Sequence, residues 1–231
     1  MKDAKLSDRL RKDADAIWKQ IFAHPFVVEL YTGVLPPAKF KFYVLQDYNY
    51  LVTDIKNLAI LASRAGSIEA MREILEIAHL EATSEFESYE RLLGELGYTI
   101  GDAIKAEPTP TNTSYGAFLI ATSSLKTFGE GLAATLPCFW SYLEIAEFHQ
   151  ARLAENKNGL YARWASVYLS DDYRQLVTKM KSLLDKAVGV EYEKLRGAFI
   201  TASKYEYLYW SMAYEMEGWP IPAKQTWNEI R

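Results

Sequence analysis

Apolar residues recur at steps of three and four along almost every segment of this chain, and this spacing constrains the fold more than any other feature. Near the N-terminus, Leu6, Leu10, Ala14, Ile17 and Ile21 fall on one face of a helix. No stretch of useful length alternates between apolar and polar residues, as a half-buried strand would. The sequence therefore predicts an all-α protein.

Glycine, proline and serine divide the chain into helical segments. Gly33 is suited to end a short helix, and Ser67 and Ser170 are suited to cap the helices that follow them. Residues 98–113 have the weakest helical signals, and we expect them to form a structureless crossover. We expect one domain over residues 1–231, with a loosely ordered tail at 223–231. The expected helices cover about 6–24, 26–31, 37–64, 68–96, 114–128, 132–153, 160–169, 171–188 and 191–216.

Charge and composition exclude several classes of partner. The chain has 26 Lys and Arg against 30 Asp and Glu, a formal charge of −4, and no basic cluster that would indicate nucleic-acid binding. A cationic small molecule suits this charge better. There is no run of about eighteen uncharged apolar residues to span a membrane, and no apolar core of a signal peptide. The single cysteine cannot form an internal disulfide, so we expect a cytoplasmic protein.

The histidines and glycines give little support for a metal or a cofactor. Glu76 and His79 have the Glu-x-x-His spacing of di-iron bundles, but such sites need a second pair of this kind on another helix. Glu147 and His149 are only two residues apart, so they face different directions. There is also no glycine-rich loop of the kind that binds phosphate. We therefore expect no metal and no cofactor.

A polar stripe marks the predicted helix at 37–64. Tyr43, Asp47, Tyr50 and Asp54 share one face at steps of four, three and four, among apolar neighbours. A face in contact with water would favour lysine and glutamate over this mixture of tyrosine and aspartate. The stripe indicates either the wall of a cavity or a solvated face, and the spacing alone does not decide between them.

The only cysteine, Cys138, directly follows Pro137 inside a long apolar segment. Proline removes a backbone N–H and disturbs the helix one turn earlier, which loosens the backbone beside the thiol. Tyr142 lies four residues further on, so both side chains point from one face. Cys138 is either a buried structural residue or a nucleophile.

A nucleophilic cysteine needs a base, because only a few per cent of an ordinary thiol is ionised at neutral pH. Asp47 and Glu206 are the candidates. Glu206 stands among Tyr205, Tyr209 and Trp210, where burial would raise the pKa of its carboxyl group and suit it to proton transfer. The alternative is an exposed glutamate flanked by interface tyrosines.

Three segments together resemble the TenA/thiaminase II family. They are Gln-Asp-Tyr-Asn-Tyr-Leu at 46–51, Leu-Pro-Cys-Phe-Trp-Ser-Tyr at 136–142 and Tyr-Glu-Tyr-Leu-Tyr-Trp-Ser-Met-Ala-Tyr at 205–214. Each segment is weak by itself, but the three occur in the right order and at the right separations over nearly the whole chain. Residues 112–115 and 164–168 also fit the pattern. Cys138 indicates the branch of the family that has this cysteine, and Phe139 replaces a tyrosine common among relatives.

The resemblance implies a haem-oxygenase-like multi-helix bundle that binds no haem and assembles as a homotetramer. It implies hydrolysis of an aminopyrimidine to hydroxymethylpyrimidine, a salvage step toward thiamin, with thiamin cleavage as a related activity. Cys138 would then add to the pyrimidine ring, Asp47 would hold the ring amine and nitrogen and support the thiol, and Glu206 would be the acid/base. The tyrosines implied to bind the ring are Tyr50, Tyr115, Tyr142 and Tyr168.

Asp47 and Glu206 should act on the thiol in the same way but differ in their own protonation. Their negative charge disfavours a thiolate, so we expect Cys138 to rest as a thiol. We expect hydrogen bonds to keep Asp47 ionised, and poor hydration to raise the pKa of Glu206. The alternative functions are a non-catalytic pyrimidine-binding or regulatory protein, and an oxidative or metal-dependent enzyme on the same fold. A sensor needs no nucleophile, and a metal enzyme needs more histidines than this chain has.

Overall fold

The computed structural model describes residues 4–187 and 189–221, and every regular element in these residues is helical. The expected tail at 223–231 lies outside the described residues. The elements are α1 (Leu6–Asp13), α2 (Asp15–Phe22), α3 (Pro25–Thr32), α4 (Pro37–Arg64), α5 (Ile68–Leu80), the π-helical turn η1 (Glu81–Glu85), α6 (Phe86–Glu95), α7 (Ile100–Lys105), α8 (Pro110–Leu125), α9 (Phe128–Phe148), α10 (Gln150–Glu155), α11 (Gly159–Ser166), the 3₁₀ turn η2 (Val167–Leu169), α12 (Asp171–Asp185) and α13 (Tyr192–Glu215). The predicted all-α class is confirmed.

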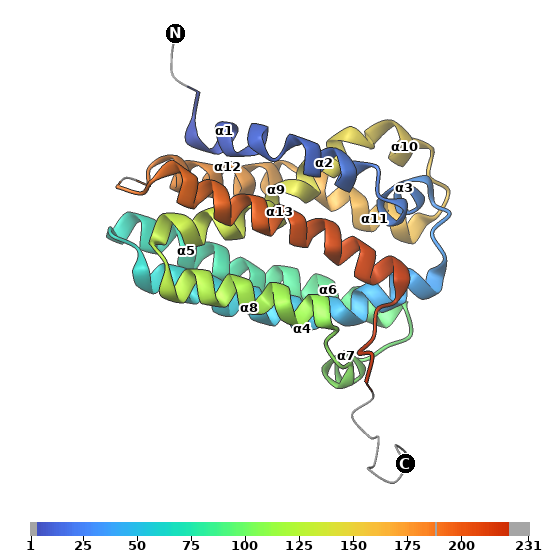
Figure 1. Ribbon diagram of the computed structural model, residues 1–231. Helices are drawn as coiled ribbons and strands as arrows, with labels where there is room; N and C mark the ends of the chain where they lie inside the picture. Colours follow the sequence, from blue (N-terminus) through green and yellow to red (C-terminus); the bar gives the residue numbers. More distant parts are fainter. Residues whose placement is uncertain (1–3, 188, 222–231) are drawn as a thin grey trace.

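Two long helices, α9 and α13, run through the middle of the bundle and make its most extensive helix-to-helix contact (Figure 1). Helices α1 and α2 lie on one side of this pair, and α4, α5 and α8 lie on the other. Helix α4 packs against α5 and α8, while α12 packs against α9. Helices that are distant in the chain therefore surround α9.

Helix α9 is the centre of the core because all of its residues from 129 to 141 are buried. Its start is fixed by a capping box: the Thr127 hydroxyl accepts from the backbone N–H of Glu130, whose carboxylate accepts from the Thr127 backbone N–H. Trp140 on α9 packs edge-on against Trp18, with ring centroids 5.6 Å apart, and Trp18 stacks on Phe199 of α13. These rings join α2, α9 and α13.

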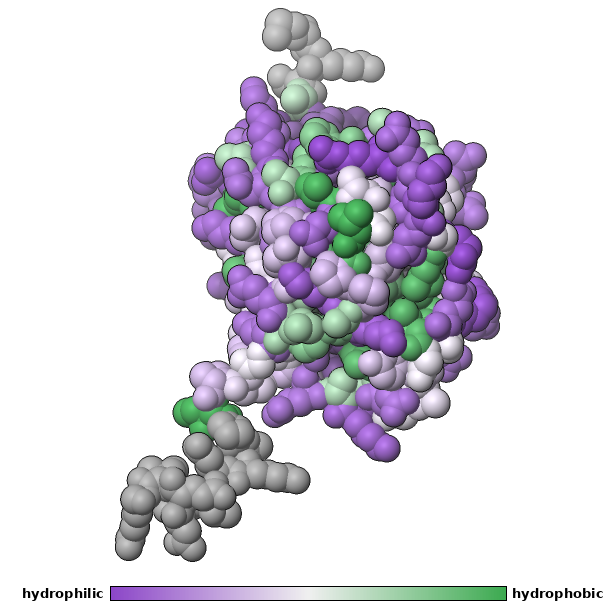
Figure 2. Space-filling model, turned by 90° about the vertical axis from the view of Figure 1, so that its right-hand side faces the viewer, coloured by the Kyte–Doolittle hydropathy of each residue, from purple (hydrophilic) through white to green (hydrophobic). Residues whose placement is uncertain are grey.

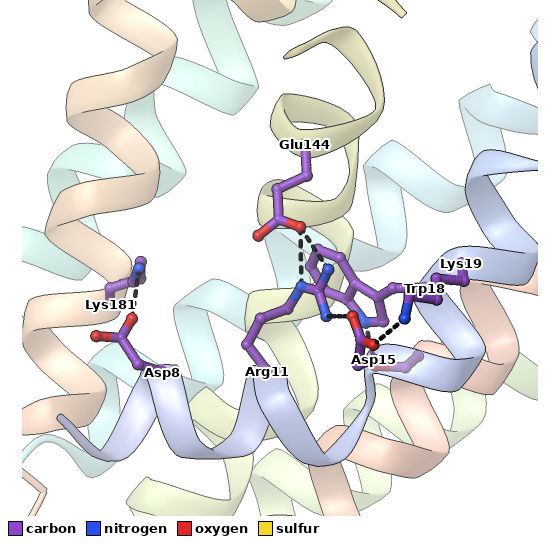
Figure 3. Close-up of polar contacts among 8 residues, drawn as sticks. Asp8, Arg11, Asp15, Trp18, Lys19, Glu144 and Lys181 are labelled. Carbon is purple, nitrogen blue, oxygen red and sulfur yellow. Dashed lines mark hydrogen bonds and ion pairs between the residues drawn. The ribbon is translucent and has the colours of Figure 1, made fainter. Parts of the chain in front are cut away.

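Arg11 anchors the N-terminal helices to α9 (Figure 3). Its Nε and Nη2 atoms donate hydrogen bonds of 2.9 and 2.7 Å to Oε2 of Glu144. The guanidinium carbon also lies 4.2 Å from the ring centroid of Trp18, at cation–π distance. On the same side of the bundle, Lys181 Nζ of α12 donates to Oδ1 of Asp8 at 3.0 Å. Helix α1 is thus held against both α9 and α12.

Most predicted helix ends are confirmed. Ser67 and Ser170 cap α5 and α12 through hydrogen bonds from backbone N–H groups, and Gly33 ends α3 with φ 83°. The predicted first helix is divided at Ala14 into α1 and α2, although Ala14 keeps helical backbone angles. The predicted helix at 68–96 is interrupted by the π-helical turn η1.

The prediction of a structureless crossover at 98–113 is wrong. Thr99 and Asp102 form a capping box that starts the short helix α7. Thr109 caps α8, which begins at Pro110 rather than at the predicted residue 114. Proline suits the first turn of a helix, where its missing N–H costs no hydrogen bond. Pro110, which lies within the predicted crossover, therefore marks a helix start.

One end of the bundle has a mostly polar surface. Figure 2 shows the end that lies at the right of Figure 1, where hydrophilic residues cover most of the surface and hydrophobic residues form small separate groups. Among the described residues, none of the helices combines the length and hydropathy needed to cross a membrane.

Close helix packing at Gly131 gives a test of this arrangement. A Cβ atom at Gly131 would lie 2.5 Å from Cδ2 of Leu61 and 3.1 Å from Oγ of Ser123. We expect Gly131→Ala to lower the free energy of unfolding by about 1–3 kcal/mol, because α9 would be pushed from α4 and α8. In Gly197→Ala, the new Cβ on α13 has no neighbour within 4 Å, so this control should be stabilised by about 0.5–1 kcal/mol. Urea unfolding of both variants measures the difference, and equal effects would contradict the packing.

Candidate active site

A pocket of about 600 Å³, including the space at its mouth, lies against α9 in the centre of the bundle. Its walls come from α4, η1, α8, α9, η2, α12 and α13. It is lined by five carboxylates, seven tyrosines, one cysteine and two apolar residues, which are Asp47, Asp54, Glu81, Glu85, Glu206, Tyr43, Tyr50, Tyr115, Tyr142, Tyr168, Tyr173, Tyr209, Cys138, Leu51 and Phe139. No lysine, arginine or histidine is among these lining residues.

The structure brings together every residue that the sequence analysis singled out as a site residue. The pocket is lined by Cys138, Glu206, Asp47, Tyr50, Tyr115, Tyr142 and Tyr168. They come from α4, α8, α9, η2 and α13, so the pocket joins elements from the first quarter of the chain to its last long helix. The stripe on α4 lines the cavity, which decides between the two alternatives left open by its spacing.

Cys138 lies in the pocket wall with 8% of its surface exposed. Burial raises the pKa of its thiol well above the usual value, and the charges of Asp54 and Glu206 raise it further. The expectation that Cys138 rests as a thiol is therefore confirmed. A nucleophilic role requires the proton to leave as the sulfur attacks.

Glu206 is 3% exposed and is held by two hydroxyl groups. The Tyr115 Oη atom donates to Oε1 at 2.7 Å, and the Ser141 Oγ atom donates to Oε2 at 3.2 Å. Burial raises the pKa of Glu206 to about 7, although the two hydrogen bonds act in the opposite direction. The predicted raised pKa is confirmed, and it places the carboxyl group near the value best suited to proton transfer at neutral pH.

Asp47 differs from the prediction. It is half-buried on α4, and no hydrogen bond to its carboxylate is found in the described part of the chain. Burial raises the pKa of Asp47 well above its usual value, and the charges of Glu85 and Glu206 add to this effect. The expectation that hydrogen bonds keep Asp47 ionised is therefore wrong, because its neighbours are other acids and tyrosine rings.

The sequence analysis did not include Asp54 among the site residues, although it ends the stripe on α4. Asp54 is 2% exposed, and burial raises its pKa to about 7. Its Oδ1 atom accepts a 3.4 Å hydrogen bond from Asn57, which also donates to Thr135 Oγ1 at 2.8 Å. Thr135 lies one turn before Cys138 on α9. Asp54, and not Asp47, is the carboxylate whose charge acts most on the thiol.

Glu81 and Glu85 were also missed. They line the pocket from η1, and both are half-buried. Burial raises the pKa of both carboxyl groups. Their sequence signal is weak, because glutamates four residues apart on a helix are typical of a solvated face. Only the packing of η1 over the pocket distinguishes them.

The tyrosine hydroxyls divide into paired and unpaired groups. Tyr43 and Tyr142 are joined by a 3.0 Å hydrogen bond between their Oη atoms, and Tyr173 donates to the carbonyl of Phe139 at 2.9 Å. The hydroxyls of Tyr50 and Tyr209 are buried and have no hydrogen-bond partner among the described residues. Two buried donors without partners are unfavourable unless a ligand or water satisfies them. They indicate that a polar molecule binds here.

A second hollow adjoins the pocket. Asp47, Glu85 and Tyr168 line both of them, and the second hollow also includes Arg91 and Arg163. Two of the three shared residues are carboxylates. No cluster of His, Cys, Asp and Glu suited to hold a metal ion is found over residues 4–187 and 189–221.

A helical bundle with a cysteine, acids and tyrosines around a central pocket defines a class of protein that binds a small polar molecule and has groups able to react with it. Residues 11–216 match the family model described as the TENA/THI-4/PQQC family, and the chain belongs to this family. This confirms the family resemblance of the three sequence segments.

Several similar proteins match this chain over most of their own length. Aminopyrimidine aminohydrolase of Helicobacter pylori is 34% identical and aligns over 91% of this chain and 99% of its own. The protein of the same name from Bacillus subtilis is 33% identical, over 93% and 92%. A structure described as a TenA homologue from P. horikoshii OT3 is 48% identical with a TM-score of 0.89, covering 92% and 99%. A domain from Shewanella denitrificans with a heme oxygenase-like fold has 14% identity over 90% and 92% and a TM-score of 0.75, which agrees with the predicted fold.

The buried acids predict an unusual dependence of stability on pH. Unfolded carboxyl groups titrate near pH 4, whereas Glu206 and Asp54 titrate near 7 in the folded protein. The folded protein thus binds more protons across this window, so its free energy of unfolding should fall as the pH rises from about 4 to 7. Glu206→Gln should lack the part of this fall that Glu206 causes, up to ~3 kcal/mol of the free energy of unfolding. At pH 8 the variant should therefore be more stable than the wild type.

Urea unfolding at a series of pH values measures this effect. Glu90→Gln, at an exposed position on α6, is the control and should keep the wild-type dependence. If the free energy of unfolding depended on pH in the same way for Glu206→Gln and the wild type, the raised pKa of Glu206 would be contradicted.

Proposed function

We propose that the protein is an aminopyrimidine aminohydrolase, a hydrolase acting on C–N bonds in thiamin metabolism. Its substrate is 4-amino-5-aminomethyl-2-methylpyrimidine, its product is hydroxymethylpyrimidine, and the reaction serves thiamin salvage. Two relatives of this name align over nearly their whole length. The observation that carries the proposal is that Cys138 and Glu206 share one pocket with Asp47.

Each of these residues has a distinct role in the proposed reaction. Cys138 attacks the pyrimidine ring, and a bond forms between Sγ and a ring carbon while the thiol proton passes to a nearby carboxylate. Asp47 holds the ring amine and the adjacent ring nitrogen. Its raised pKa falls when a positively charged pyrimidine binds, because an opposite charge favours the ionised carboxylate.

Addition of sulfur makes the ring electron-rich, so that it expels the amine of the aminomethyl group and leaves a methylene group on the ring. The ammonium group leaves as ammonia, and Glu206, with a pKa of about 7, takes a proton from the incoming water and passes it to the ammonia. Water adds to the methylene carbon, the Sγ–carbon bond breaks and the aromatic ring is restored. The overall reaction exchanges an amine for a hydroxyl group.

The tyrosines fit the shape and polarity of a pyrimidine. Tyr142 and Tyr168 lie with ring centroids 4.9 Å apart, and Tyr50 and Tyr115 lie 5.4 Å apart. The rings of each pair contact each other and present an aromatic surface to the pocket against which a flat ring can pack, and the Tyr50 hydroxyl, which has no partner among the described residues, suits a ring nitrogen or amine. Thiamin contains the same pyrimidine, and its cleavage, the thiaminase II activity, is a second reaction that we propose for this site.

The remaining features of the proposed protein follow the family expectation. We propose one domain, a cytoplasmic location, no cofactor and assembly as a homotetramer. A non-catalytic pyrimidine-binding or regulatory role is the alternative, but it leaves the cysteine in the pocket without a purpose. Purified protein incubated with the aminomethylpyrimidine and no added metal tests the proposal, since a binding protein releases no ammonia.

Replacement of Cys138 tests covalent catalysis. We expect Cys138→Ser to lower kcat about a thousandfold or more, because the variant keeps only binding and orientation. Steady-state kinetics measures the loss. Calorimetric affinity for hydroxymethylpyrimidine and the unfolding temperature should both stay near the wild-type values. A serine variant that turns over at close to the wild-type rate would show that the mechanism is not covalent.

The two proposed acids should give different kinetic changes. Asp47→Asn should raise KM and lower kcat together, because an amide replaces an acceptor with a donor toward the ring amine. Glu206→Gln should mainly lower kcat, and it should remove or shift the fall in rate on the acid side of the pH profile near 7. Rates and KM measured between about pH 5 and 9 distinguish them. Equal losses of affinity, with an unchanged acid limb in Glu206→Gln, would contradict these roles.

A further inference from the structure

Two acids of the pocket, Glu81 and Glu85, have no role in the reaction proposed above. Both come from the π-helical turn η1, which interrupts the otherwise continuous helix from α5 to α6. Turns of this kind are rare and occur frequently at functional sites. Both side chains line the same pocket as Cys138.

Neither carboxyl group has a partner of opposite charge among the described residues. Over residues 4–187 and 189–221, no hydrogen bond or ion pair involves the side chain of Glu81 or Glu85, and the pocket lining contains no basic residue. They lie four residues apart on one side of the helix, where like charges destabilise each other. The charges of Asp47 and Asp54 also act on Glu81. A cation between these groups would remove this repulsion.

An independent observation also indicates a polar ligand. Tyr209 is only 3% exposed, and its hydroxyl has no hydrogen-bond partner among the described residues. It lies in the wall of the same pocket. A buried hydroxyl without a partner costs free energy, so a group that accepts or donates a hydrogen bond is expected beside it. The acidic pair therefore belongs to a cavity that is built to hold a polar molecule.

We propose that Glu81 and Glu85 bind the ammonium group of the substrate and so distinguish the aminomethyl substrate from the hydroxymethyl product. This inference rests on the proposed function and adds to it the charge of the ligand. The substrate carries a primary ammonium group at neutral pH, whereas the hydroxyl group that replaces it is neutral. Carboxylates without a basic partner attract the first and gain nothing from the second. The pocket would then have a lower affinity for the product than for the substrate.

The test compares two ligands that differ only in this group. Dissociation constants are measured by calorimetry for the aminomethylpyrimidine and the hydroxymethylpyrimidine, in the full chain carrying Cys138→Ser so that no turnover occurs. We expect Glu85→Gln and Glu81→Gln, added singly, each to weaken binding of the aminomethyl ligand about tenfold or more. Binding of the hydroxymethyl ligand should change less than about twofold. Glu87→Gln, at an exposed position on α6 directly after η1, is the matched control and should change the binding of neither ligand.

A second measurement separates this role from a structural one. Removing one of two like charges should leave the unfolding temperature unchanged or raised, whereas loss of a structural contact would lower it. Equal weakening of both ligands, or no change for either, would overturn the inference while leaving the proposed function in place. If the parent protein bound neither ligand, and the wild type released no ammonia from the aminomethylpyrimidine, the proposed function would fail and this inference with it.

Discussion

The desolvation of carboxyl groups in the centre of the bundle is the constraint on which the site depends. Five acids line a pocket whose other walls are mainly tyrosine rings, and no basic side chain is among its lining residues in the described part of the chain. Burial therefore favours the protonated form of each acid, and it also holds Cys138 as a thiol. A positively charged ligand reverses this balance, since it stabilises the ionised carboxylates. The pocket is thus arranged for a cation before any particular substrate is considered.

The packing of α9 makes this arrangement possible. Because the first half of α9 is buried on every side, its residues contact α4, α8, α12 and α13 together. Small residues on α9, such as Gly131, allow neighbouring helices to approach closely. Asn57 then joins α4 to α9 and α8 through Thr135 and Ser123. The same contacts that stabilise the core also fix the position of Cys138.

Much of the fold and the site could be predicted from the sequence because the signals are local. Helical spacing and caps such as Ser67 and Ser170 act within a few residues, and the stripe on α4 is a property of one helix. The short helix α7 was missed because its only signal is the capping box of Thr99 and Asp102. Pro110, within the same predicted crossover, belongs to the first turn of α8.

By itself, the sequence determined the helical class through spacing within single segments, whereas the family and the seven site residues came from the resemblance of three segments taken together. Only the tertiary structure decided that Asp54, Glu81 and Glu85 line the same pocket, and that Asp47 has no hydrogen bond among the described residues to keep it ionised. The physical reason is that the pKa of a carboxyl group depends on its burial and on nearby charges. Both are set by helices that are distant in the chain and meet only when the bundle is folded.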